Sequence, residues 1–119
     1  MKFRDTFYIK ISKNTITIRC IETQEQATAT SEFSSNRLLV GNFTNADKTI
    51  KELVSRVTAR RFYKIPVAVI HPLEMVDGGL SQIEERIFKE LALSSGARKA
   101  YIHLGPLLND SSVLATTKT

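Results

Sequence analysis

The sequence has little cysteine and no long hydrophobic stretch. Its 119 residues include one cysteine, Cys20, which excludes an internal disulfide and is typical of a reducing compartment. No apolar run approaches the about 20 residues that a helix needs to span a bilayer. The first residues also lack the apolar segment and small-residue cleavage site of a secretory signal. We therefore expect a cytoplasmic protein without a membrane span.

The length and the composition predict one domain. Hydrophobic residues make up 42% of the chain, and a chain of this size can bury roughly two-thirds of the surface exposed when it is unfolded. We find no internal repeat, linker or low-complexity block. We expect a single domain over 1–119 with an ordered core at about 5–108 and a frayed tail at 109–119.

The charge is moderately positive, at +5. Ordinary proteins and nucleic-acid binders both fall in this range, so the charge alone does not separate them. The densest basic stretch, 56–64, contains no acidic residue. One interpretation is the solvated C-terminal end of a helix, where cations are favoured, and the other is a patch that binds an acidic protein, nucleic acid or anionic lipid. The candidate residues for such a patch are Arg56, Arg60, Arg61, Phe62 and Lys64.

The first third of the chain has the period of β-strands. Apolar residues alternate with polar ones over 7–11 and again over 16–20, which predicts a β-hairpin. The segment 27–33 is rich in threonine and lacks large apolar residues until its last position, so we expect a third strand at a sheet edge. The short apolar run 38–40 lies between two turn segments.

The rest of the chain predicts alternating helices and strands. A helical apolar stripe covers about 45–60, and a second covers 80–96 and ends at a glycine suited to a C-cap. The continuous apolar run 66–70 is typical of a central strand in a parallel sheet, and 99–104 is a further strand. The order βββαβαβ and right-handed crossovers predict a mixed five-stranded α/β sheet with helices packed on it. The stripe of the second helix consists of Leu80, Ile83, Ile87, Phe88 and Leu91.

Three segments carry a family resemblance. They are Tyr8-Ile9-Lys10-Ile11 with Asn14-Thr15, then Val67 to Pro72, then Gly96-Ala97-Arg98-Lys99-Ala100-Tyr101-Ile102 at the junction between the second helix and the last strand. From about residue 5 to residue 108 the chain resembles the first subdomain of MreB, the rod-shape-determining member of the actin-like ATPases. The resemblance implies an actin-like half-domain, a fold shared with ribonuclease-H-like nucleases.

The resemblance does not extend to the chemistry of that family. In MreB-like proteins a D-x-G-T motif in the first hairpin supplies a carboxylate beside the metal and a glycine beside the phosphates. Those positions are Lys10, Ser12 and Lys13 here. The family's acidic pair before a proline corresponds to Leu104-Gly105 before Pro106. Because a cation replaces the metal ligand, we expect no ATP, no metal and no nuclease activity.

Three other features have candidate functions. His71 and His103 both end predicted parallel strands, so they could form a metal or proton-transfer pair, although single histidines at strand ends usually bond to backbone or water. Cys20 alternates in phase with core residues and is expected to be a small core residue rather than a nucleophile. Gly78-Gly79 precedes a helix but lacks the Lys-Ser/Thr of a phosphate loop, and we interpret it as a turn.

Three functional hypotheses follow. The first is a non-catalytic actin-like domain that binds another protein, with a link to the cell-shape cytoskeleton implied by the resemblance, or that associates with itself. The second is a small basic nucleic-acid-binding domain that uses the 56–64 stretch. The third is an enzyme centred on the two histidines.

Overall fold

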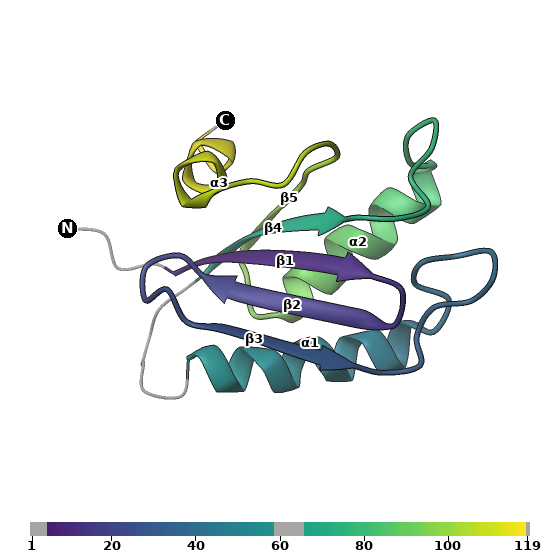
Figure 1. Ribbon diagram of the computed structural model, residues 1–119, viewed down its shortest axis with the longest axis horizontal. Helices are drawn as coiled ribbons and strands as arrows, with labels where there is room; N and C mark the ends of the chain where they lie inside the picture. The colour runs from purple at the N-terminus through teal and green to yellow at the C-terminus, as the bar shows by residue number, and fades with distance from the viewer. Residues whose placement is uncertain (1–4, 59–65, 119) are drawn as a thin grey trace.

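The computed structural model describes residues 5–58 and 66–118, which form one sheet and the helices around it (Figure 1). None of the described helices has the length and apolar character needed to cross a membrane. The strands are β1 (Thr6–Ser12), β2 (Thr15–Cys20), β3 (Gln26–Thr30), β4 (Val67–Pro72) and β5 (Lys99–Ile102), and the helices are α1 (Phe43–Val57), α2 (Gln82–Ser94) and α3 (Asp110–Thr116).

The sheet is five-stranded in the order β3-β2-β1-β4-β5. The first three strands pair antiparallel, whereas β4 pairs parallel with both β1 and β5. This is the predicted mixed sheet, with β3 at one edge and the apolar β4 inside it. The topology places the carboxyl ends of β1, β4 and β5 at one edge of the sheet, where open α/β sheets bind their ligands.

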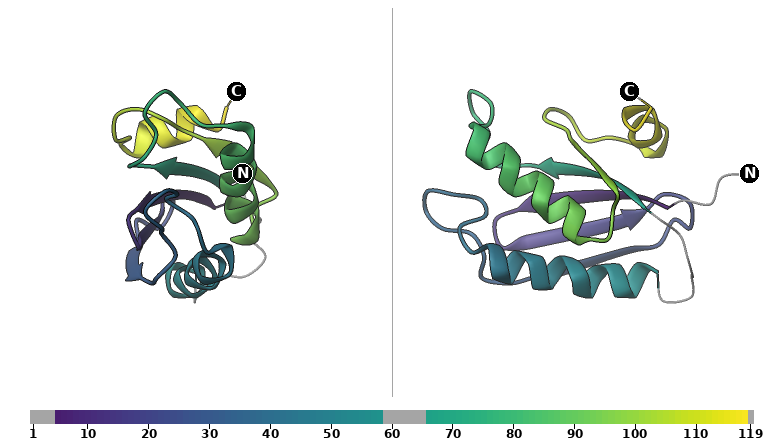
Figure 2. Two further views of the ribbon diagram at one scale, coloured as in Figure 1. Left: turned by 90° about the vertical axis from the view of Figure 1, so that its right-hand side faces the viewer. Right: turned by 180° about the vertical axis from the view of Figure 1, so that it is seen from behind.

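One face of the sheet packs against α1 and α2, which lie in front of the strands when the molecule is seen from behind (Figure 2). Alternate residues of β1, Phe7, Ile9 and Ile11, are buried in this core. Burying side chains of this size contributes about 1.5–3 kcal/mol each, which makes this layer the main source of stability. The helices contribute Ile50, Leu53, Val57, Phe88 and Leu91.

The opposite face of the sheet is covered at one end by α3. Val113 of α3 is fully buried against Tyr8, Ile21 and Val69. The expectation of a frayed tail over 109–119 is therefore wrong for the described residues up to 118. Asn109 accepts a hydrogen bond from the Ser112 N–H and caps the helix, a signal that the polar composition of the tail conceals.

Local boundaries differ from the predictions where tertiary contacts decide them. The third strand ends at Thr30 instead of residue 33, because Phe33 turns into the core. The apolar run 38–40 forms no strand. Ile83, predicted on the buried stripe of the second helix, is 76% exposed. Gly96 has a φ of 98° and ends α2 as predicted.

Candidate functional site

The candidate site lies where the parallel strands β1 and β4 end. Their register sets Lys10 opposite His71 and Tyr8 opposite Val69. Because side chains alternate along a strand, these residues lie on the face that α1 and α2 do not cover. The site therefore occupies the same sheet edge as the predicted histidine pair and includes Lys10.

His71 is buried and has a partner at each ring nitrogen. It is 1% exposed, its Nδ1 lies 2.7 Å from the Tyr8 hydroxyl, and its Nε2 lies 2.9 Å from the Gly105 carbonyl oxygen. A carbonyl oxygen only accepts, so Nε2 carries the proton and Nδ1 accepts from Tyr8. Burial is the largest influence on the pKa of His71 and lowers it; the bond to Gly105 opposes this, while His103 and Lys10 lower the pKa further. The ring is therefore neutral near pH 7.

Tyr8 connects His71 to the segment that follows β5. Its hydroxyl accepts a hydrogen bond from the Leu108 N–H at 3.1 Å while it donates to His71. Burial raises the pKa of Tyr8, and the bond from Leu108 only partly offsets this. The phenol therefore keeps its proton, and the pair holds the chain from Gly105 to Leu108 against the sheet.

His103 is the second predicted histidine, and it does lie beside the first. The two ring centroids are 4.6 Å apart in an edge-to-face arrangement. Nε2 of His103 lies 2.9 Å from the Pro106 carbonyl oxygen. Both imidazoles thus donate to carbonyls of the same short turn. Neither belongs to a group of three metal-ligating side chains among the described residues.

Lys10 lies over the ring of Tyr8. Its Nζ lies 5.6 Å from the centroid of the Tyr8 ring, within the range of a cation–π interaction. Ser12 is the last residue of β1, and the exposed Lys13 N–H donates to Glu74 Oε2 at 2.6 Å. A carboxylate of this chain therefore lies against the hairpin turn that follows β1.

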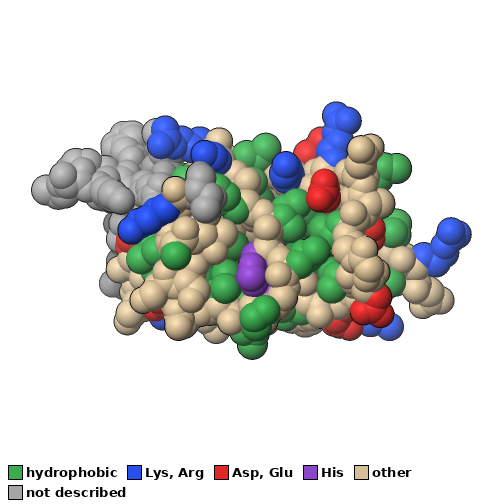
Figure 3. Space-filling model, turned by 90° about the horizontal axis from the view of Figure 1, so that it is seen from above, with side chains coloured by type: hydrophobic (Ala, Val, Ile, Leu, Met, Phe, Trp, Pro, Cys, Tyr) green, Lys and Arg blue, Asp and Glu red, His purple; other side chains and the backbone are tan. Residues whose placement is uncertain are grey.

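Exposed apolar side chains surround this edge of the sheet. We name four of them, Leu73, Met75, Leu104 and Leu107, the leucine surface; they follow β4 and β5 and are 39%, 44%, 39% and 66% exposed. Figure 3 looks onto this side of the molecule and shows hydrophobic side chains gathered around an imidazole. Exposed apolar side chains on one side of a folded domain make that side a candidate for contact with another molecule.

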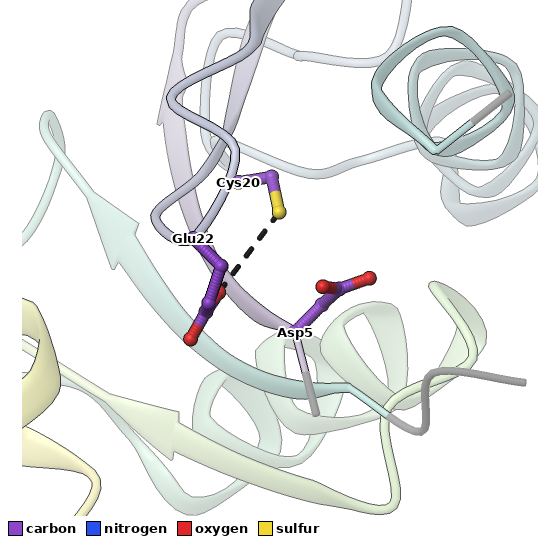
Figure 4. A group of neighbouring side chains, drawn as sticks. All are labelled: Asp5, Cys20 and Glu22. Carbon is purple, nitrogen blue, oxygen red and sulfur yellow. Dashed lines mark hydrogen bonds between the residues drawn. The ribbon is translucent and has the colours of Figure 1, made fainter. Parts of the chain in front are cut away.

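Cys20 is fully buried, as predicted, and belongs to a small cluster with Asp5 and Glu22 (Figure 4). One ligand atom from each lies within 4.8 Å of the others. Thiol and carboxylate groups can hold a zinc-sized ion, but the two Glu22 oxygens accept from the Thr6 N–H at 2.6 Å and the Thr6 hydroxyl at 2.7 Å. Burial raises the pKa of the Cys20 thiol, and the negative charges of Asp5 and Glu22 add to this. The cluster thus ties the start of β1 to the end of β2.

The predicted basic patch is described only at its first residue. Arg56 forms an exposed i, i+4 ion pair with Glu52 at 2.9 Å, which is typical of a solvated helix face. Arg60, Arg61, Phe62 and Lys64 lie outside the described residues. Nucleic-acid binding by this stretch stays a prediction.

Sequence reasoning missed two parts of the site. The Tyr8–His71 bond depends on the register of two strands that are 63 positions apart at these residues, which no local pattern contains. Glu74 was not singled out because an acidic residue in a loop is ordinary. The local clue to the Tyr8–His71 bond is that Tyr8 points to the same side of β1 as Lys10, opposite to Ile9 and Ile11.

Comparison with known proteins finds relatives in sequence and in fold. The chain is 36% identical over 121 residues to the uncharacterised protein YjaA of Escherichia coli (strain K12), covering 93% of this chain and 95% of YjaA. No protein-family model matches. The ethanolamine utilization protein EutJ from Carboxydothermus hydrogenoformans superposes with a TM-score of 0.63 at 12% identity, over 86% of this chain and 38% of EutJ.

The second fold relative is the PPX-GPPA enzyme of Aquifex aeolicus, with a TM-score of 0.50 and 12% identity over 85% of this chain and 36% of the enzyme. Both structures have the actin-like ATPase fold. The fold is therefore the predicted actin-like, ribonuclease-H-like half-domain. This chain spans little more than a third of the length of either protein.

Proposed function

We propose that this chain, which belongs to the same family as YjaA of Escherichia coli, is a non-catalytic domain of the actin-like superfamily that acts by binding another protein. One observation carries the proposal. At the sheet edge where ligands of open α/β sheets bind, the imidazoles of His71 and His103 hydrogen-bond within the chain, and the apolar side chains of the leucine surface face outward.

The charges at this edge argue against a nucleotide. A metal-bound phosphate needs a carboxylate on β1 and open backbone N–H groups at the hairpin turn. Here Lys10 supplies a positive charge on β1, and Glu74 places a negative charge on the Lys13 N–H. Lys10 therefore repels the metal ion of a bound nucleotide, and Glu74 repels its phosphates.

The environment of the buried His71 argues against a role for that residue as a general base. A general base needs a ring nitrogen that can reach a substrate. Both nitrogens of the buried His71 have protein partners, and Nε2 of His103 donates to Pro106. The two imidazoles therefore organise the turn that presents Leu104 and Leu107.

The leucine surface suits an apolar face of a protein partner. Exposed leucine and methionine side chains gain most when a partner removes them from water. The resemblance to MreB makes a filament-forming cytoskeletal protein the first partner to test. We place the interaction in the cytoplasm because the single cysteine is a free thiol.

The test compares two leucines. Leu107→Asp on the leucine surface is expected to abolish partner retention in a cross-linked co-purification. Leu93→Asp, at a similarly exposed position on α2 (45%), is expected to leave retention unchanged. Equal retention by both variants would exclude the leucine surface as the binding site.

Calorimetric titration with Mg-ATP tests the non-catalytic part of the proposal. We expect no binding heat with the wild-type chain. Saturable binding, lost when Lys13 and Glu74 are replaced by alanine, would contradict the proposal directly.

A further inference from the structure

Strand β3, which forms one lateral edge of the sheet, carries a separate feature. Strand β3 has β2 on one side and no strand on the other side in the described part of the chain. Two flanking hydrogen bonds determine which residues of β3 bond to β2. They run from Ser31 N–H to Asn14 O and from Cys20 N–H to Glu25 O. With the register Ala29 to Ile16, the alanines of β3 direct their backbone groups to β2. The backbone groups of Gln26, Thr28 and Thr30 therefore point outward.

Within the described residues, β3 itself lacks several of the usual protections against strand pairing. Natural edge strands are protected by charged residues, proline, bulges or covering segments. The five residues Gln-Ala-Thr-Ala-Thr contain no charge and no proline, and the pairing with β2 is regular. A row of outward backbone donors and acceptors without these devices is suited to accept another strand.

The sequence of β3 is nearly symmetric about its centre. Ala27 and Ala29 flank Thr28, and polar Gln26 and Thr30 stand outside them. If a second copy pairs antiparallel about Thr28, alanine meets alanine on the helix side and threonine meets threonine on the other. No like charges meet within the pair, and small side chains allow the strands to approach.

We propose that this edge joins two copies of the chain in a two-fold symmetric dimer. Thr28 pairs with Thr28 of the second copy, Ala27 pairs with Ala29, and Gln26 pairs with Thr30. The two sheets become one continuous sheet, and a two-fold contact of this kind closes without leading to fibres. The Thr28 hydroxyl, 2.9 Å from the Thr17 hydroxyl, extends a row of hydroxyl groups across the junction.

A groove of mixed charge lies beside the edge. A cavity of about 210 Å³ lies between the end of β3 and α1. Lys48 and Glu52 of α1, which carry opposite charges, line it. The other lining residues are Ala29, Thr30, Ser31, Asn45 and Thr49.

A charge-swap experiment tests this dimer. Thr28→Lys and Thr28→Glu each place like charges opposite one another at the two-fold axis, and each is expected to raise the dimer dissociation constant by roughly tenfold. An equimolar mixture of the two variants is expected to recover dimers. Sedimentation at several protein concentrations measures the mass, and Ser111→Lys on α3 is the matched control.

A disulfide variant keeps the test decisive if the charged variants fold poorly. Residues opposite each other in an antiparallel pair have Cα atoms about 5.5 Å apart, which suits a disulfide. Because Cys20 is fully buried, Thr28→Cys is expected to form a covalent dimer on mild oxidation. A wild-type chain that stays monomeric at every concentration, or Thr28→Cys that stays monomeric on oxidation, would overturn the inference. Leu107→Asp is expected to leave the dimer intact, which separates this result from the partner-binding test.

Discussion

The hydroxyl of Tyr8 lies 2.7 Å from Nδ1 of His71, and this contact joins the middle of β1 to the end of β4. The same hydroxyl accepts from Leu108, and the same imidazole donates to Gly105. Two buried side chains therefore hold the turn from Gly105 to Leu108 on the sheet.

Tyr8→Phe is expected to lower the free energy of unfolding by about 1–3 kcal/mol, because it leaves the buried His71 and the partly buried Leu108 N–H without their hydrogen bond. Urea denaturation measures the loss. Tyr101→Phe, which removes one partly buried bond to Thr117 O, serves as the control and is expected to cost less. If Tyr8→Phe were as stable as the wild type, the hydroxyl would have no part in holding the turn.

His71 is expected to make stability depend on pH. Its pKa in the folded chain is lowered below the ordinary value of 6.5, so the unfolded chain binds the proton more readily. Stability should therefore be constant above about pH 6.5 and fall as the pH drops from there toward the folded pKa, by at most about 1.4 kcal/mol per pH unit.

Denaturation at a series of pH values, with His71→Gln for comparison, measures this dependence. The slope below pH 6.5 is expected to shrink in His71→Gln and to persist in His103→Gln, whose ring is partly exposed. A slope that is the same in His71→Gln as in the wild type would assign the dependence to other groups.

Cys20 is expected to be unreactive in the folded chain. It has no exposed surface, and burial raises the pKa of its thiol, so little reactive thiolate forms at pH 8. A colorimetric thiol reagent should modify it only at the rate at which the chain unfolds, and in denaturant it should react at once. Rapid reaction under native conditions would show that the Asp5–Cys20–Glu22 cluster opens locally.

Val113→Ala is expected to destabilise α3 selectively. Val113 is fully buried in the cluster with Tyr8 and Val69, and its loss should cost roughly 2 kcal/mol. Hydrogen exchange should speed up over 113–117 and remain slow in β1 and β4. Ser111→Ala, on the exposed side of α3, provides the baseline; uniform faster exchange in the whole sheet would mean that α3 does not open separately.

The sequence predicts this fold well where burial follows a local period. The alternation around Ile9 and Ile18 identifies the hairpin, and the apolar run from Val67 to Ile70 identifies the central strand. Gly96 marks a helix end because its backbone needs a positive φ. Each of these features is predictable because it depends on residues that are close together in the sequence.

The candidate site is less predictable because long-range contacts create it. The closeness of His71 and His103 follows from two parallel strands, and was predicted. The bond from Tyr8 to His71 needs a particular register, and α3 is stabilised by Arg19, whose guanidinium makes two bonds of 2.9 Å with Asp110 at a separation of 91 positions. A polar helix of seven residues has too little intrinsic stability to be recognised alone.

Because α3 covers one end of the sheet, that end stays unprotected until α3 has been synthesised. Tyr8 leaves the ribosome about a hundred residues before Leu108 and Val113, the groups that shelter it. At translation rates of roughly 5–20 residues per second, several seconds pass before the residues that cover this end of the sheet are made. In the last part of that interval, after β4 has been made, the nascent chain exposes Val69 together with Tyr8 and Ile21 until α3 covers them.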